Sequence, residues 1–243
     1  SGGAGVATLA VNYNSRIGET AADFGVSFDG VAARDIAAQG PEFAWLDVLR
    51  APISGSVRSG LNSDGRFAPS NATLQIGKGA VQPNALTKPV PFDGARSYFS
   101  YDPAKRLLRF DELSVRSPWI TGQATGTASL TTDGVQGPLT ELIGQITLSN
   151  LVANPFELYP EPVDLSEADM DFRLELNPFR ITLGRLQISD RGKTLLVDGE
   201  LAADPGGWRL ALDGRMDGLE PDRLLELWPE GVKPKTRKWL GDN

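Results

Sequence analysis

The sequence predicts a mainly β protein: a twisted, curved antiparallel sheet that forms a groove, with short helices near residues 35–49 and 221–240. The first reason is alternation in the segment 168–176, where every second residue is apolar from position 170 onward. These residues are Met170, Phe172, Leu174 and Leu176. Side chains two apart share one face of a strand, so this strand has an apolar face and a polar face. The second reason is composition, because 27 glycines and 17 prolines in 243 residues suit many strands joined by tight turns.

The chain divides by pattern near residue 50. Residues 1–50 are expected to hold two strands, at 5–12 and 24–31, and a short helix. In the first strand both alternating sets contain apolar residues, so the pattern does not decide which face of the strand is apolar. Residues 51–243 are expected to form a repetitive antiparallel β-groove segment that ends in short helices. We expect both parts to make one continuous structural unit.

A helix is predicted over residues 35–49. Pro41 suits a first helical position, and Phe43, Leu46 and Leu49 follow at helical spacing. The expected role is a short amphipathic helix that covers one end of a sheet.

Turn signals divide the β-rich part. Asp-Gly pairs at 64–65 and 133–134 tolerate the positive φ that hairpin turns need. Further turns are expected at 102–105 and 205–207. The segment 77–90 is expected to be an irregular loop, because two prolines interrupt any strand there.

A loose internal repeat relates residues 106–115 to residues 179–188. In both segments the apolar alternation changes phase halfway, which predicts a β-bulge or strand break at the same place. Each segment is followed by a turn and a strand that contains glycine, at 120–130 and 194–201. A repeated unit favours a one-dimensional array of strands, although chance similarity between amphipathic strands would look the same.

The C-terminal region has helical character. Pro221 begins a segment in which Leu224, Leu227 and Trp228 share a face. A basic cluster follows at residues 235–238, and it suits a solvated face or a protein contact better than a ligand site.

Composition excludes several kinds of chemistry. The net charge of −7 disfavours a nucleic-acid partner, which needs clustered cations. The absence of Cys removes thiol nucleophiles and disulfides, and the absence of His removes the usual proton shuttle and metal ligand. We expect no enzyme, no catalytic residue, no cofactor and no metal. The acidic residues of 164–171 could in principle bind calcium, but their alternation fits the solvated face of a strand.

The most specific motif lies in the segment 227–240, where Trp-Pro is followed by a short spacer and Lys-Thr-Arg-Lys-Trp-Leu. This motif resembles a segment of the large AsmA-like envelope proteins of the YhdP type. The turn 101–105, the strand 144–148 and the segment 207–210 agree with that resemblance, which covers residues 50–243.

The resemblance implies a periplasmic, taco-like β-groove with an apolar interior, anchored to the inner membrane at its N-terminus. It also implies a role in moving phospholipid between the inner and outer membranes of Gram-negative bacteria. We expect this chain to be a piece of the periplasmic part of a longer protein, with the anchor outside it.

The expected function is therefore to bind and conduct the acyl chains of phospholipid, without a chemical step. The side chains expected to line the apolar face are Met170, Phe172, Leu174, Leu176, Ile181, Leu183, Leu186, Ile188, Leu195, Val197, Trp208, Leu210 and Leu212. The same residues could instead form a solid core. Two alternatives are a structural scaffold that binds envelope proteins through its edge strands, and a carboxylate-based sugar hydrolase, which would need two facing acids.

Overall fold

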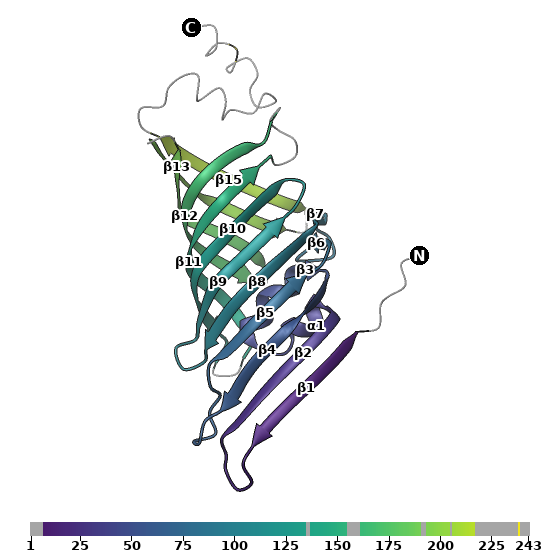
Figure 1. Ribbon diagram of the computed structural model, residues 1–243. Helices are drawn as coiled ribbons and strands as arrows, with labels where there is room; N and C mark the ends of the chain where they lie inside the picture. The colour runs from purple at the N-terminus through teal and green to yellow at the C-terminus, as the bar shows by residue number, and fades with distance from the viewer. Residues whose placement is uncertain are drawn as a thin grey trace.

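A large antiparallel sheet dominates the molecule, as the sequence predicts (Figure 1). The computed structural model describes residues 7–134, 137–154, 161–190, 193–204, 206–216 and 238. The main sheet has twelve strands in the order β1-β2-β4-β5-β8-β9-β10-β11-β12-β13-β14-β15, so each strand pairs with the next one that joins the sheet. The sheet is twisted and curved along its length (Figure 1).

The strands of the main sheet lengthen in its second half. Their bounds are Thr8–Ser15 (β1), Ala22–Ala32 (β2), Pro52–Leu61 (β4), Ser70–Ile76 (β5), Gly94–Asp102 (β8), Leu107–Arg116 (β9), Ile120–Thr132 (β10), Leu139–Ala153 (β11), Val163–Leu176 (β12), Phe179–Asp190 (β13), Lys193–Asp204 (β14) and Gly207–Met216 (β15). The predicted hairpin turns are present, because Gly65 and Gly134 have φ of 78° and 76° in the turns after β4 and β10.

The helical segment is real, but it is broken in two. A five-residue α-helix, α1 (Ala33–Ala37), is followed by a 3₁₀-helix, η1 (Pro41–Val48). Pro41 does stand at the start of a helix, as predicted, and this explains the break. Proline lacks an N–H and forces the residue before it out of the helical region, so one helix cannot run through Gly40 and Pro41.

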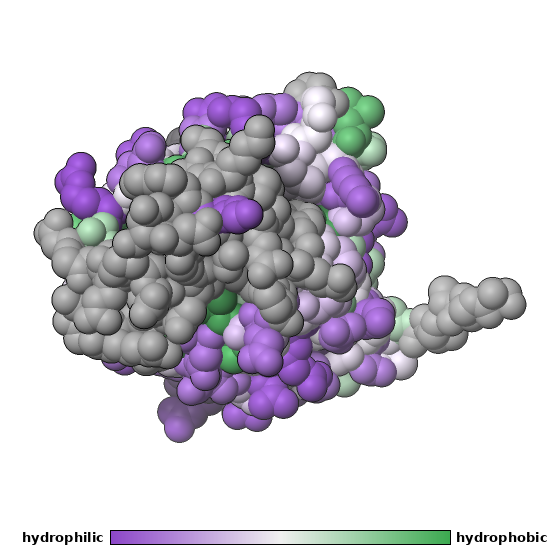
Figure 2. All heavy atoms as spheres, turned by 90° about the horizontal axis from the view of Figure 1, so that it is seen from above, coloured by the Kyte–Doolittle hydropathy of each residue, from purple (hydrophilic) through white to green (hydrophobic). Residues whose placement is uncertain are grey.

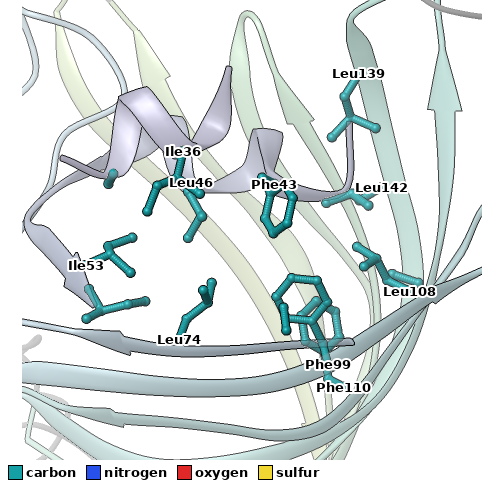
Figure 3. Packing of buried hydrophobic residues seen from close by; sticks show 14 of the residues in the cluster. Ile36, Phe43, Leu46, Ile53, Leu74, Phe99, Leu108, Phe110, Leu139 and Leu142 are labelled. Atoms are coloured by element: carbon teal, nitrogen blue, oxygen red, sulfur yellow. The ribbon is translucent and has the colours of Figure 1, made fainter. Parts of the chain in front are cut away.

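These two helices cover part of one face of the sheet. Ala33, Ile36, Phe43 and Leu46 are buried against it, and Leu46 has no exposed surface. Figure 3 shows Ile36, Phe43 and Leu46 pointing toward apolar residues of the strands. The labelled sheet residues are Ile53, Leu74, Phe99, Leu108, Phe110, Leu139 and Leu142. We call this side of the main sheet the inner face.

A second sheet of three short strands corrects the expected loop at 77–90. The strands β6 (Gly79–Val81) and β7 (Val90–Phe92) pair with each other, and β6 pairs with β3 (Leu49–Arg50). The prediction was wrong for residues 79–81 and 90, but residues 82–89, which contain Pro83 and Pro89, do form a loop. The two strands lie on either side of these prolines, and Pro91 lies in β7, an edge strand of this small sheet.

The predicted bulge is present in both copies of the repeat. Asp111 is the extra residue in β9 where it pairs with β8, and Gly184 is the extra residue in β13 where it pairs with β12. The residue before each bulge, Phe110 or Leu183, pairs with a glycine of the next strand. These glycines, Gly126 and Gly199, have φ of 154° and 157°. The predicted C-terminal helix lies outside the described residues, apart from Lys238.

Candidate functional site

The inner face is apolar across the whole width of the main sheet. One row of paired residues shows this, because residues opposite each other on neighbouring strands point to the same side. The row runs from β1 to β14 through Val11, Val26, Val57, Ala72, Phe99, Phe110, Gly126, Ile146, Met170, Leu186 and Val197. This row also shows which alternating set of residues in β1 lies on the inner face: it is the set that contains Val11.

The structure brings the thirteen predicted residues together on this face. The β12 residues Met170, Phe172 and Leu174 lie opposite the β13 residues Leu186, Leu183 and Ile181. Further pairs across β12–β15 include Leu176 with Phe179, Leu186 with Val197, Ile188 with Leu195, Leu201 with Leu210, Gly199 with Leu212, and Ala203 with Trp208. The alternation in the sequence therefore identified a real, continuous surface.

Burial along this surface is greatest under the helices and falls toward both edge strands, since Leu9 and Val11 on β1 are 67% and 64% exposed. Under the helices, Leu74 and Leu108 are 0% exposed. Of the thirteen residues, Ile188 is buried at 8% exposure, whereas Leu210 and Leu212 on β15 are 61% and 50% exposed. The other predicted residues are half-buried. Among the described residues, the protein's own side chains thus seal the inner face near the helices and leave it open toward both edge strands, β1 and β15.

The loop between β6 and β7 reaches across to the C-terminal strands. The Trp208 indole Nε1 donates a hydrogen bond to the Lys88 carbonyl oxygen at 2.7 Å, and the Asn84 side-chain amide donates to the Ala203 carbonyl oxygen at 3.2 Å. Trp208 also packs edge-on against Phe179, with ring centroids 5.8 Å apart. Trp208, one of the thirteen predicted residues, therefore lies beside this loop. No local sequence signal marks contacts between residues so far apart in the chain.

A hollow that the sequence did not predict lies on the inner face beside the start of η1. Its volume is about 590 Å³, within the range of small-molecule sites, which is roughly 300–1,000 Å³. Its apolar lining includes Phe24, Phe43, Val57 and Phe67, and Phe67 is 64% exposed. Phe67 follows the hairpin turn after β4 and packs edge-on against Phe24 at 6.4 Å. The only feature of the sequence that points to this hollow is an aromatic residue, Phe67, that lies outside the strands.

Charged and polar side chains also line the hollow, among them Glu42, Tyr101 and Arg106. Desolvation by burial raises the pKa of the Glu42 carboxyl group above its usual range. Burial, and then the negative charge of Glu42, raise the pKa of the Tyr101 hydroxyl. The hollow is therefore a mainly apolar space with a poorly hydrated carboxylate at its wall.

The opposite side of the sheet, the outer face, is mainly polar, although Ile143 and Leu196 on it are 43% and 40% exposed. Figure 2 views the molecule from above, and most of the coloured surface at that end is hydrophilic, with hydrophobic side chains in a few places. Two carboxylates of the acidic segment 164–171 accept hydrogen bonds on this face: Asp169 from Thr147 Oγ1 at 2.8 Å and Asp171 from Gln145 Nε2 at 2.9 Å. Among the described residues, no group of three or more acidic side chains could hold a metal ion.

Comparison with protein-family models, with curated proteins and with solved structures found no match. Within the described ranges, no helix has the length and apolar character needed to cross a membrane.

Proposed function

We propose that this chain binds the acyl chains of phospholipid along the inner face of its curved sheet, as a segment of a lipid-conducting groove. One observation carries the proposal: the inner face is apolar across the main sheet, yet it stays open at its β15 edge, where Leu210 and Leu212 are 61% and 50% exposed. An apolar sheet face must be covered by protein or by an apolar ligand. We interpret the uncovered part as the place for the ligand.

The binding would need no polar contact. Removing apolar surface from water contributes about 25 cal/mol per Å², so roughly 200 Å² of buried acyl chain contributes about 5 kcal/mol. Such binding is non-directional, so a chain can slide from one row of leucines to the next without a chemical step. The hollow lined by Phe24 and Phe67 offers a second apolar space on the same face.

The covered part of the inner face favours a second candidate, an envelope scaffold without lipid conduction. The helices bury Leu46 and Leu74 completely, so no acyl chain passes between them and the sheet in this arrangement. In the groove proposal this region is a wall that divides two lipid-accessible parts, whereas in the scaffold proposal it is the core of a rigid support. The resemblance to AsmA-like envelope proteins, a periplasmic location and a membrane anchor outside this chain belong to the groove proposal.

Neighbouring residues on β15 provide the test, because they point to opposite faces. A photoreactive amino acid in place of Leu212 on the inner face should crosslink phospholipid in cells that make the protein. The same amino acid in place of Ala211, which is also exposed but faces outward, should crosslink none. Equal lipid crosslinking at both sites, or protein adducts without lipid at Leu212, would reject the groove and favour the scaffold.

Lipid extraction and mass spectrometry of the purified protein give an independent measurement. Leu174→Asp should lower the lipid yield, because it places a charge in the middle of the apolar face. Leu174 also packs against the core, so circular dichroism must show that the variant is folded. An unchanged lipid yield from a folded Leu174→Asp protein would contradict the proposal.

A further inference from the structure

In the part of the chain that the structure describes, the first strand, β1, is an edge strand without the usual protection. One side of its backbone pairs with β2, in an unbroken register from Thr8 to Ser15. Soluble proteins protect such edges with lysines, prolines, bulges or a covering segment, because an open edge accepts further strands. β1 contains no charged residue and no proline, and its register has no bulge. The opposite edge strand, β15, carries Arg209, Asp213 and Arg215.

The inner-face side chains of β1 are also exposed. Leu9, Val11 and Tyr13 are 67%, 64% and 66% exposed, although they lie opposite Phe28, Val26 and Phe24 of the inner face. A further strand beside β1 would pair its free backbone groups and cover these three side chains together. Among the described residues, no strand lies on the other side of β1, so its backbone hydrogen-bonding groups and its apolar side chains both have a neighbour on the β2 side only.

The pattern of β1 is complementary to itself when a second copy runs antiparallel about Val11. This register places Leu9 beside Tyr13 of the second copy, and Val11 beside Val11. On the outer side it places Thr8 beside Asn14 and Ala10 beside Asn12, so uncharged residues meet throughout. A shift by one residue would set apolar side chains beside polar ones, so the alternation selects this register against its neighbours. Aromatic–aliphatic pairs of this kind stabilise antiparallel strands.

We propose that β1 pairs with β1 of a second copy of this chain, antiparallel about Val11, and that the two main sheets become one. The two-fold axis makes the contact isologous, so the assembly closes as a dimer. Pairing of β1 with β15 of another copy would instead repeat without limit. Eight residues bury less surface than the roughly 1,200 Å² of a stable interface, so the dimer should be weak, in the micromolar range. This proposal does not depend on lipid binding.

Sedimentation equilibrium tests the association between about 1 and about 200 µM protein, because the dimer fraction must follow mass action. The unchanged protein should shift from monomer to dimer over this range. Val11→Lys brings two ammonium groups together at the two-fold axis and should raise the dissociation constant at least about tenfold. Leu212→Lys, at the other edge and 50% exposed against 64% for Val11, should leave it unchanged. A monomer at every concentration, or equal effects of the two lysines, would overturn the proposal.

Cysteine crosslinking tests the register, because the chain has no cysteine of its own. Residues directly opposite on antiparallel strands have Cα atoms about 4.5–5.5 Å apart, which suits a disulfide. Val11→Cys should form a covalent dimer on mild oxidation, and Leu212→Cys should remain monomeric under the same conditions. If mixed Val11→Cys and Leu212→Cys proteins crosslinked to each other in preference to Val11→Cys alone, the contact would be β1 with β15 and the proposed dimer would be wrong.

Discussion

The inner face carries apolar side chains both under the helices and at the β15 edge, but these side chains are buried to different extents. The same substitution, leucine to alanine, made at both places measures how much this difference in burial contributes to stability. Leu74 is 0% exposed beneath the helices, and Leu212 is 50% exposed on β15. Leu74→Ala removes a fully buried side chain and leaves a cavity, so it should cost about 2–5 kcal/mol of unfolding free energy. Leu212→Ala removes a side chain that is already half in water, and it should cost about 1 kcal/mol or less.

Urea unfolding followed by circular dichroism provides the assay. With a slope of about 2 kcal/mol per M, Leu74→Ala should lower the midpoint by roughly 1–2 M and Leu212→Ala by roughly 0.5 M or less. Leu86→Ala is the control for an exposed leucine outside the main sheet, because Leu86 lies in the β6–β7 loop and is 70% exposed. If Leu74→Ala and Leu212→Ala lowered the midpoint equally at unchanged slope, the helices would not seal one part of the face more than the other. The assignment of Leu212 to an open ligand site and of Leu74 to a covered core would then both be wrong.

Three further perturbations test other parts of the structure. Gly144→Val should cost about 1–3 kcal/mol, because a Cβ there would lie 2.4 Å from a backbone oxygen, whereas Gly206→Ala has open space and should be neutral in the same urea assay. Glu42→Gln should raise the melting temperature, and the gain should grow as pH rises above 4.5. Burial raises the pKa of the carboxyl group in the folded protein, so ionisation of Glu42 favours the unfolded chain. A gain in melting temperature at pH 4 as large as at pH 8 would contradict this. Trp208→Phe removes the hydrogen bond to the Lys88 carbonyl oxygen, so amide hydrogen exchange in the β6–β7 loop should accelerate while exchange in β4 and β5 stays unchanged. If the loop exchanged at the same rate in the variant and the unchanged protein, this hydrogen bond would not stabilise the loop.

The strands were predictable because period-two alternation is a local property. Met170, Phe172 and Leu174 identify an apolar face without any knowledge of neighbours, and the phase changes near Asp111 and Gly184 identify the bulges. The helical region was less well predicted. Its apolar spacing fits one helix, but the missing N–H of Pro41 divides it into two short pieces.

The candidate site was predictable only in part. Sequence alternation placed thirteen side chains on one face, and the strand register agrees with it. The hollow beside Phe67 and the contact between Lys88 and Trp208 were not predictable, because they join residues from distant parts of the chain. No periodicity within a segment records which other segment will lie against it.

The sequence by itself determined most strands of the main sheet, the apolar character of one face and the absence of thiol and imidazole chemistry, since each follows from residue type and local spacing. The tertiary structure alone decided how much of that face is open. The helices bury Leu46 and Leu74, while Leu210 and Leu212 stay exposed, although all four are leucines. Burial depends on which surfaces meet across the fold, and that depends on the curvature of the sheet and the paths of its loops.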